Sequence, residues 1–344
     1  MINNRGQLAD DEQKGFVNAL IGNGCPPLTL VGLMLVLCGG FALFLSATHR
    51  FLPHDIEFLG MTASELCGFY DCRVNHFMFH DRTAFGGALI AIGTLYMWAA
   101  QFPLQHGRAW AWWMFVVSGA VGFTSFLAYL GYGYLDSWHG AATLLMLPVF
   151  VVGLIKSFFH LNEPRQFKAI FKPVTTFSPL SPSAAGRICL LATAAGMILG
   201  GLIITVVGMT AVFVPEDLMY MKLTVADLHV INPRLVPLIA HDRAGFGGAL
   251  ACAGTAVLFC VWHGAASRSL WQALLMAGAA GFGTAIGVHP MIGYSNLFHL
   301  APAFLGLLIF AAGLILTRPS MYAKRELETA STEHSGNSLD FLQK

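Results

Sequence analysis

A 15-residue segment of this chain occurs twice. Residues 80–94 read HDRTAFGGALIAIGT and residues 241–255 read HDRAGFGGALACAGT, so ten of the fifteen positions are identical. The same register, with small gaps, aligns further residues in pairs: Pro53 with Pro215, Asp55 with Asp217, Thr62 with Thr224, Arg73 with Arg234, Tyr134 with Tyr294, and His139 with His299. Repetition at one period over most of a chain indicates duplication of a structural unit. We therefore expect two copies of one fold.

The composition predicts that this fold lies in a membrane. Hydrophobic residues make up 56% of the chain, charged residues 11%, and the mean hydropathy is +0.64. Stretches long enough to cross about 30 Å of hydrocarbon fall at 28–48, 84–101, 109–131, 138–158, 188–213, 245–262, 270–288 and 297–317. The sequence thus predicts an all-α integral membrane protein with eight transmembrane helices in a tandem 4+4 arrangement. Because each copy has an even number of spans, we expect a pseudo-twofold axis along the membrane normal.

The domain boundaries follow from these spans and from the polar segments between them. The predicted parts are an N-terminal segment 1–27, a first repeat 28–159 with an outer loop 49–82, a linker 160–187, a second repeat 188–317 with an outer loop 214–243, and a tail 318–344. The tail has too little apolar surface to form a core, so we expect most of it to be disordered. The first apolar stretch is too long for a cleaved signal peptide and is expected to remain as an anchor.

Basic residues predict the orientation. Thirteen of the 19 Lys and Arg residues lie in the N-terminal segment, the linker, the tail, or the loops and helix ends on the same side. Lys and Arg accumulate on the cytoplasmic side of membrane proteins. Both termini are therefore predicted to be cytoplasmic, and the two long loops are predicted to lie outside.

Each outer loop carries a helix-start pattern. Thr62-x-x-Glu65 fits a capping box and Thr224-x-x-Asp227 approximates one, so each loop is expected to hold a short helix that covers the membrane mouth like a lid. The first loop also holds Cys67 and Cys72, the two cysteines on the outer face. A local disulfide and two free thiols are both compatible with this spacing.

The repeated polar residues gather on the predicted outer face, which also holds nine of the thirteen histidines. The candidate catalytic residues are Asp81, Arg82, Asp242 and Arg243, and the candidate metal ligands are His80, His241, His139 and His299. Structural roles compete with these: the aspartates suit helix N-caps, and the arginines suit interfacial anchors. His139 and His299 each follow a capping residue by three positions, where the positive end of the helix dipole favours a neutral imidazole.

Three functional classes fit this layer. In the first, His139 and His299 bind haem between the repeats, or His80, Asp81 and His139 hold a transition metal ion, with His241, Asp242 and His299 repeating the site. The chain contains no HExxH and no CxxCH motif. The leading hypothesis is a metal- or haem-dependent membrane oxidoreductase component.

The second class is a proton-coupled transporter of a small molecule, and the third is a non-catalytic membrane scaffold or subunit. The near-neutral net charge of +1 gives no reason to expect nucleic-acid binding. The expected partners are the lipid bilayer and other membrane proteins. The copies differ at several positions, such as Asp136 against Asn296 and His54 against Glu216, which predicts an asymmetric site.

Overall fold

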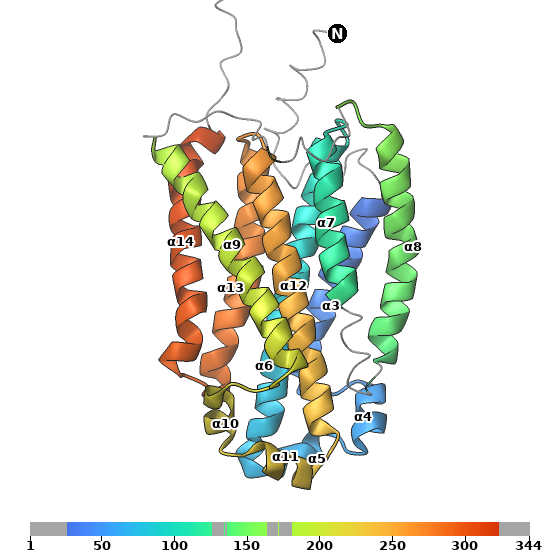
Figure 1. Ribbon diagram of the computed structural model, residues 1–344, viewed down its shortest axis with the longest axis vertical. Coiled ribbons are helices and arrows are strands. Elements are labelled where there is room, and N and C mark those ends of the chain that lie inside the picture. The colour runs from blue at the N-terminus through green and yellow to red at the C-terminus, as the bar shows by residue number, and fades with distance from the viewer. Residues whose placement is uncertain (1–25, 126–133, 135, 164–170, 172–180, 323–344) are drawn as a thin grey trace, which may run out of the picture.

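The computed structural model describes residues 26–125, 134, 136–163, 171 and 181–322, and within these residues the protein is all-helical (Figure 1). Seven described helices are long and apolar enough to cross a membrane. They are α3 (Pro26–Ala47), α6 (Arg73–Ala99), α8 (Ser137–Phe159), α9 (Pro182–Met209), α12 (Leu235–His263), α13 (Arg268–Ile292) and α14 (Leu297–Tyr322). The chain is therefore a multi-pass helical membrane protein.

The span expected at 109–131 corresponds to α7 (Ala109–Ser125), which has 17 residues. Residues 126–131 of that span lie outside the described residues, so the count of eight spans stays a prediction. The N-terminal segment 1–25 and the tail from 323 onward also lie outside the described residues, as does most of the predicted linker.

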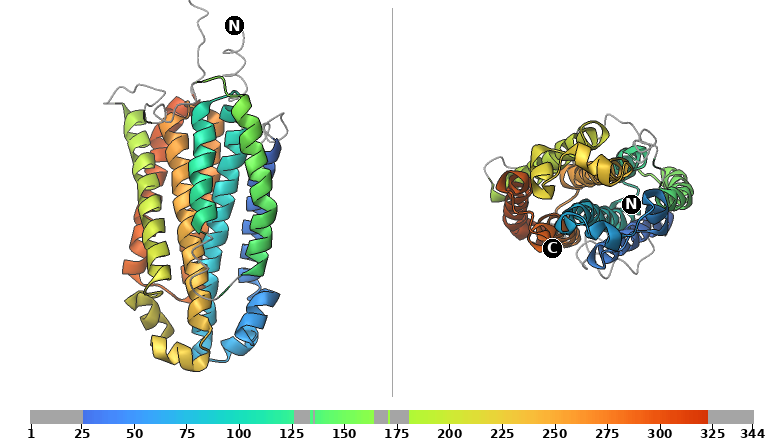
Figure 2. Two further views of the ribbon diagram at one scale, coloured as in Figure 1. Left: turned by 45° about the vertical axis from the view of Figure 1, so that its right-hand side comes forward. Right: turned by 90° about the horizontal axis from the view of Figure 1, so that it is seen from below.

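Helices α6 and α12 form the centre of the bundle. In their most apolar stretches 78% and 83% of residues are buried, against 17–28% in the other five spans. Helix α6 packs against α3 and α13, whereas α12 packs against α9 and α7, and the two central helices also touch each other (Figure 2). Glycines permit the closest approach: a Cβ atom on Gly39 of α3 would lie 2.5 Å from the carbonyl oxygen of Gly86 on α6.

The central helices begin earlier than the hydropathy predicts. Helix α6 starts at Arg73 instead of residue 84, and α12 starts at Leu235 instead of residue 245. The polar residues that resemble a loop in the sequence are buried between helices and paired, so the helix continues through them. The expectation that Asp81 and Asp242 act as N-caps is therefore wrong, because both lie in the helix interior.

Four short helices lie together at one end of the bundle, here called the lid end (Figure 1). They are α4 (Pro53–Leu59), α5 (Ala63–Cys67), α10 (Pro215–Met221) and α11 (Val225–Ile231). Both predicted helix starts are confirmed: Thr62 accepts a hydrogen bond from the amide of Glu65, and Thr224 accepts one from the amide of Asp227, each at 3.2 Å.

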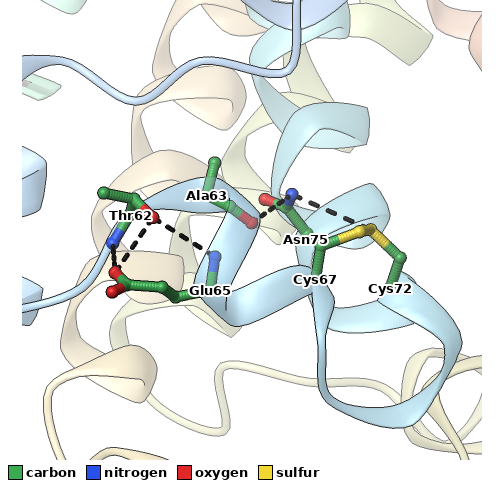
Figure 3. Close-up of a disulfide and its surroundings, with 6 residues drawn as sticks. All are labelled: Thr62, Ala63, Glu65, Cys67, Cys72 and Asn75. Carbon is green, nitrogen blue, oxygen red and sulfur yellow. Dashed lines mark hydrogen bonds between the residues drawn. A yellow bond between two sulfur atoms is a disulfide. The ribbon is translucent and has the colours of Figure 1, made fainter.

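The cysteines of the first lid are bridged. Cys67 ends α5, and its disulfide with Cys72 fastens this short helix to the start of α6 (Figure 3). Asn75 donates a hydrogen bond to the carbonyl oxygen of Ala63 at 3.1 Å and so ties the same two elements together. The second copy has His229 and Pro233 at the two cysteine positions, so this bridge belongs to the first lid alone.

Candidate functional site

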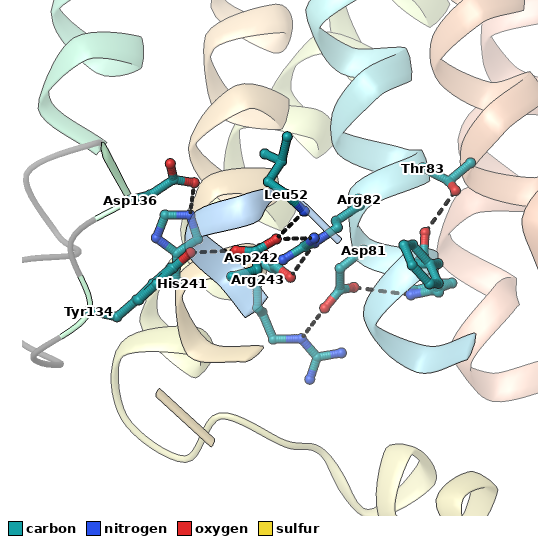
Figure 4. Close-up of polar contacts among 12 residues, drawn as sticks. Leu52, Asp81, Arg82, Thr83, Tyr134, Asp136, His241, Asp242 and Arg243 are labelled. Atoms are coloured by element: carbon teal, nitrogen blue, oxygen red, sulfur yellow. Dashed lines mark hydrogen bonds and ion pairs between the residues drawn. The ribbon is translucent and has the colours of Figure 1, made fainter. Parts of the chain in front are cut away.

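A layer of buried charges joins the lid end to the central helices. The guanidinium of Arg82 on α6 donates to Asp55 of α4 at 2.7 Å and to Asp242 of α12 at 2.8 Å (Figure 4). The Arg82 side chain is 13% exposed, and those of Asp55 and Asp242 are 1% and 5% exposed. One arginine of the first copy therefore holds a carboxylate from each copy.

The second copy repeats this arrangement. Arg243 on α12 donates to Asp217 of α10 at 2.5 Å. It also lies 3.4 Å from Asp81 of α6 (Figure 4). The ionic layer thus comprises Asp55, Arg82, Asp242, Asp217, Arg243 and Asp81. Because each arginine bridges its own lid to the other copy's central helix, the layer links the two copies and both lids.

The lid aspartates have three roles each. Asp55 accepts a hydrogen bond from the amide of Leu52 at 3.2 Å, which starts α4, and it also binds Arg82 and the hydroxyl of Tyr134. Asp217 does the same for α10, and the hydroxyl of Tyr294 donates to it at 2.8 Å. Neither aspartate was among the candidate site residues of the sequence, although repetition in both copies was the signal that could have identified them.

The first His cluster consists of Asp136, His139 and His241, whose ligand atoms lie within 4.8 Å of one another. Asp136 caps α8 by accepting a hydrogen bond from the His139 amide at 2.9 Å, and its other oxygen lies 2.5 Å from the imidazole of His139. His241 of α12 approaches the same carboxylate at 3.4 Å (Figure 4), and His54 of α4 approaches it at 2.8 Å.

The second His cluster consists of His80, His289 and His299, again with ligand atoms within 4.8 Å. The Nε2 atoms of His80 and His289 are 3.0 Å apart, a distance at which two ring nitrogens must share a proton or a cation, because two lone pairs would repel. His80 directs its Nδ1 atom to Asp81 at 3.0 Å, and the Nδ1 atom of His299 lies 3.2 Å from the hydroxyl of Tyr294.

The structure groups the histidines differently from the sequence hypotheses. His80 of the first copy joins His299 of the second, and His241 of the second copy joins His139 of the first. It does not bring His80 together with His139, and His139 and His299 belong to different clusters. Sequence spacing cannot show this, because the clusters form where a central helix of one copy meets the outer helices of the other.

Each cluster takes its third member from a position that differs between the copies. Asp136 corresponds to Asn296, and His289 corresponds to Tyr129. The first cluster therefore offers two imidazoles and a carboxylate, whereas the second offers three imidazoles. His289 was missed as a candidate because no residue of its type repeats in the first copy.

Both donor sets suit a transition metal ion. Imidazole favours zinc, copper, iron and nickel, and a site with three protein ligands leaves a coordination position open. In the second cluster Asp81 lies against Nδ1 of His80. Many metal-bound histidines are oriented by a carboxylate in this way. The clusters could therefore hold two separate ions, one on each side of the ionic layer.

Charges around the first cluster favour an ionised carboxylate. Burial alone would raise the pKa of Asp136, but hydrogen bonds from His139, His241 and His54 outweigh it and hold the pKa well below its usual range. Burial opposes the charging of His54, and its hydrogen bond to Asp136 reverses this and raises the pKa of His54. At neutral pH the carboxylate of Asp136 is therefore ionised.

No protein-family model, no curated protein and no solved structure matches this chain.

Proposed function

We propose that this protein is a metal-dependent component of a membrane oxidoreductase, with one metal ion in each His cluster. The observation that carries the proposal is the convergence of three ligand-capable side chains in each of two groups of the described residues, with two of the three side chains buried in each group. Polar side chains inside a membrane bundle are costly and commonly functional. His139, His241 and Asp136 bind the first ion, and His80, His289 and His299 bind the second.

The ionic layer has a positioning role in this proposal. Asp81 orients His80, and the backbone of α12 places Asp242 next to His241. Arg82 and Arg243 fix these aspartates by ion pairs. Their second ion pairs, to Asp55 and Asp217, hold the lids in place. The crossed grouping favours separate metal ions over one haem, because a haem bridged by His139 and His299 needs both residues on one site.

The proposed architecture is two copies of four helices about a pseudo-twofold axis along the membrane normal, with α7 as the eighth span. Helix α7 of the first copy packs on α12 of the second, and α13 of the second copy packs on α6 of the first. This reciprocal packing supports the proposed symmetry. We also propose that the lid end faces outside and both termini face the cytoplasm. This orientation is supported by basic residues at the opposite helix ends, namely Arg108, Lys156, Arg187, Arg268 and Arg318.

The test is metal analysis of protein purified without a polyhistidine tag. We expect about two transition metal ions per chain, falling to about one in His80→Ala and in His241→Ala, because each substitution removes one ligand from a three-ligand site. His263→Gln is the matched control, since His263 is also a buried histidine of α12 but stacks on Trp110 away from both clusters. Equal metal content in all four proteins, or none in any, would contradict the proposal.

Proton-coupled transport is the second candidate, and the ionic layer favours it. Two arginines and four aspartates between the copies form a set of exchangeable ion pairs of the kind that carriers use. Metal-free protein that still moves protons in liposomes, with the movement abolished by Arg82→Gln, would favour transport over the metal-dependent function.

A further inference from the structure

An elongated cavity of about 260 Å³ ends at the first His cluster. It lies between α3, α6, α7, α8 and α12. Most of its wall is apolar, with Val31, Leu35, Leu89, Ile92, Phe123 and Met146 among the lining residues. Its polar end is formed by Asp55, Arg82, Asp136, His139, His241 and Asp242.

The cavity is long. On α6 its lining extends from Arg82 to Tyr96, and on α3 it extends from Val31 to Leu45. At about 1.5 Å of rise per residue, each of these stretches is roughly 21 Å long, which is most of the thickness of a hydrocarbon core. A cavity of this length, with an apolar wall and one polar end, fits a hydrocarbon chain that extends along the helices from a polar head.

Two lining residues are also exposed on the surface of the bundle. Phe41 of α3 is 46% exposed and Trp138 of α8 is 53% exposed, although both line the cavity. Both helices are membrane spans with mostly exposed apolar surfaces. A ligand can therefore enter sideways from the bilayer between α3 and α8.

The charges at the polar end select the head group. Three carboxylates, those of Asp55, Asp136 and Asp242, face one guanidinium, which already donates to two of them. A phosphate or carboxylate head would lie close to these carboxylates and be repelled by them. Carboxylate oxygens accept hydrogen bonds, so the head should carry hydroxyl donors.

The aromatic surroundings of His139 favour a planar ring as that head. Phe85 meets the His139 ring edge-on with centroids 5.8 Å apart, and His139 stacks on His241 at 5.5 Å. A further aromatic ring that lies beside these rings can make offset or edge-on contacts of the same kind.

We propose that this cavity binds a membrane-soluble quinol, with its ring at the polar end beside His139 and its hydrocarbon chain lying along α3 and α6. The proposal rests on the proposed function in that it names the substrate class for the first His cluster. The binding itself requires the cavity and its polar end and no metal ion.

The test measures binding of decylubiquinol, kept reduced under anaerobic conditions, to the full-length protein in nanodiscs of neutral phospholipid. Ala142→Phe places a bulky side chain on α8 at a position that lines the cavity, and Ala42→Phe does the same on α3. Ala141→Phe is the matched control, because its neighbouring position on α8 is exposed and does not line the cavity. We expect each filling variant to weaken binding by about tenfold or more and the control to bind like the parent.

Size-exclusion profiles and melting temperatures identify variants that fail to fold, and two filling variants on different helices keep the test decisive. The proposal is overturned if decylubiquinol does not bind, if both folded filling variants bind like the parent, or if excess neutral phospholipid or detergent displaces the quinol completely. Metal analysis of the same samples separates the two ideas. Quinol bound without metal contradicts only the metal-dependent function, and metal bound without quinol contradicts only the quinol site.

Discussion

Replacing Arg82 by glutamine should be among the most destabilising single changes in this chain. The substitution removes both ion pairs of a buried guanidinium and leaves the carboxylates of Asp55 and Asp242 facing each other without a counter-ion. At an effective dielectric constant near 20, each pair contributes about 4 kcal/mol of Coulomb energy before desolvation is subtracted. Removing one partner of a buried pair typically costs about 3–5 kcal/mol. We therefore expect Arg82→Gln to lower the free energy of unfolding by that amount.

Thermal unfolding of the detergent-solubilised protein measures this loss. At about 2 °C per kcal/mol for a chain of this size, the melting temperature should fall by roughly 6–10 °C. The matched control is Arg108→Gln, because Arg108 pairs with Glu163 at 2.6 Å but the two side chains are 45% and 34% exposed. Such an exposed pair contributes about 0–1 kcal/mol.

A double-mutant cycle with Asp242→Asn tests the coupling directly. We expect the combined variant to lose about 1–3 kcal/mol less than the sum of the single variants, because the second change removes a carboxylate that the first left unpaired. Equal melting temperatures for Arg82→Gln and Arg108→Gln, or strict additivity in the cycle, would refute the idea that crossed ion pairs hold the two copies together.

Three further predictions concern the lids and the orientation. Burial alone would raise the pKa of Asp55, but the charge of Arg82 outweighs it and lowers this pKa. The ionised Asp55 therefore stabilises the fold above the unfolded pKa of about 3.9, and this stabilisation is lost as the pH falls through the lower folded pKa. Melting temperature should therefore drop steeply below about pH 4 in the parent and less steeply in Asp55→Asn, and parallel curves would contradict this. Cys67→Ser should cost about 2 kcal/mol through the lost loop closure with Cys72, and labelling of both thiols in unreduced parent protein would argue against the bridge. In intact cells a thiol reagent should label His229→Cys and not Ser178→Cys, and the reverse pattern would invert the proposed orientation.

Much of the helical architecture could be predicted from the sequence. A helix that crosses the bilayer needs a long apolar segment, and such segments are visible in the sequence. Seven of the predicted spans correspond to described helices of suitable length, and the capping patterns at Thr62 and Thr224 located both lid helices. The starts of α6 and α12 could not be predicted, since charged residues interrupt the apolar pattern after the first turns, Asp81 and Arg82 in α6 and Asp242 and Arg243 in α12. The helices continue through these residues because Arg82 pairs with Asp242 and Arg243 with Asp81 across the two copies.

The sequence by itself determined the membrane class, the repeated 15-residue segment and the set of polar residues that match between the two halves. Only the tertiary structure decided which of them meet. Histidines at matched positions could pair within a copy or across copies, and local sequence carries no information about that choice. The packing of α7 on α12 and of α13 on α6 determines that the histidines group across the copies. His80 therefore lies beside His289 and His299, and His139 lies beside His241. Long-range contacts between helices set these distances, and that is the physical reason why the site required the fold.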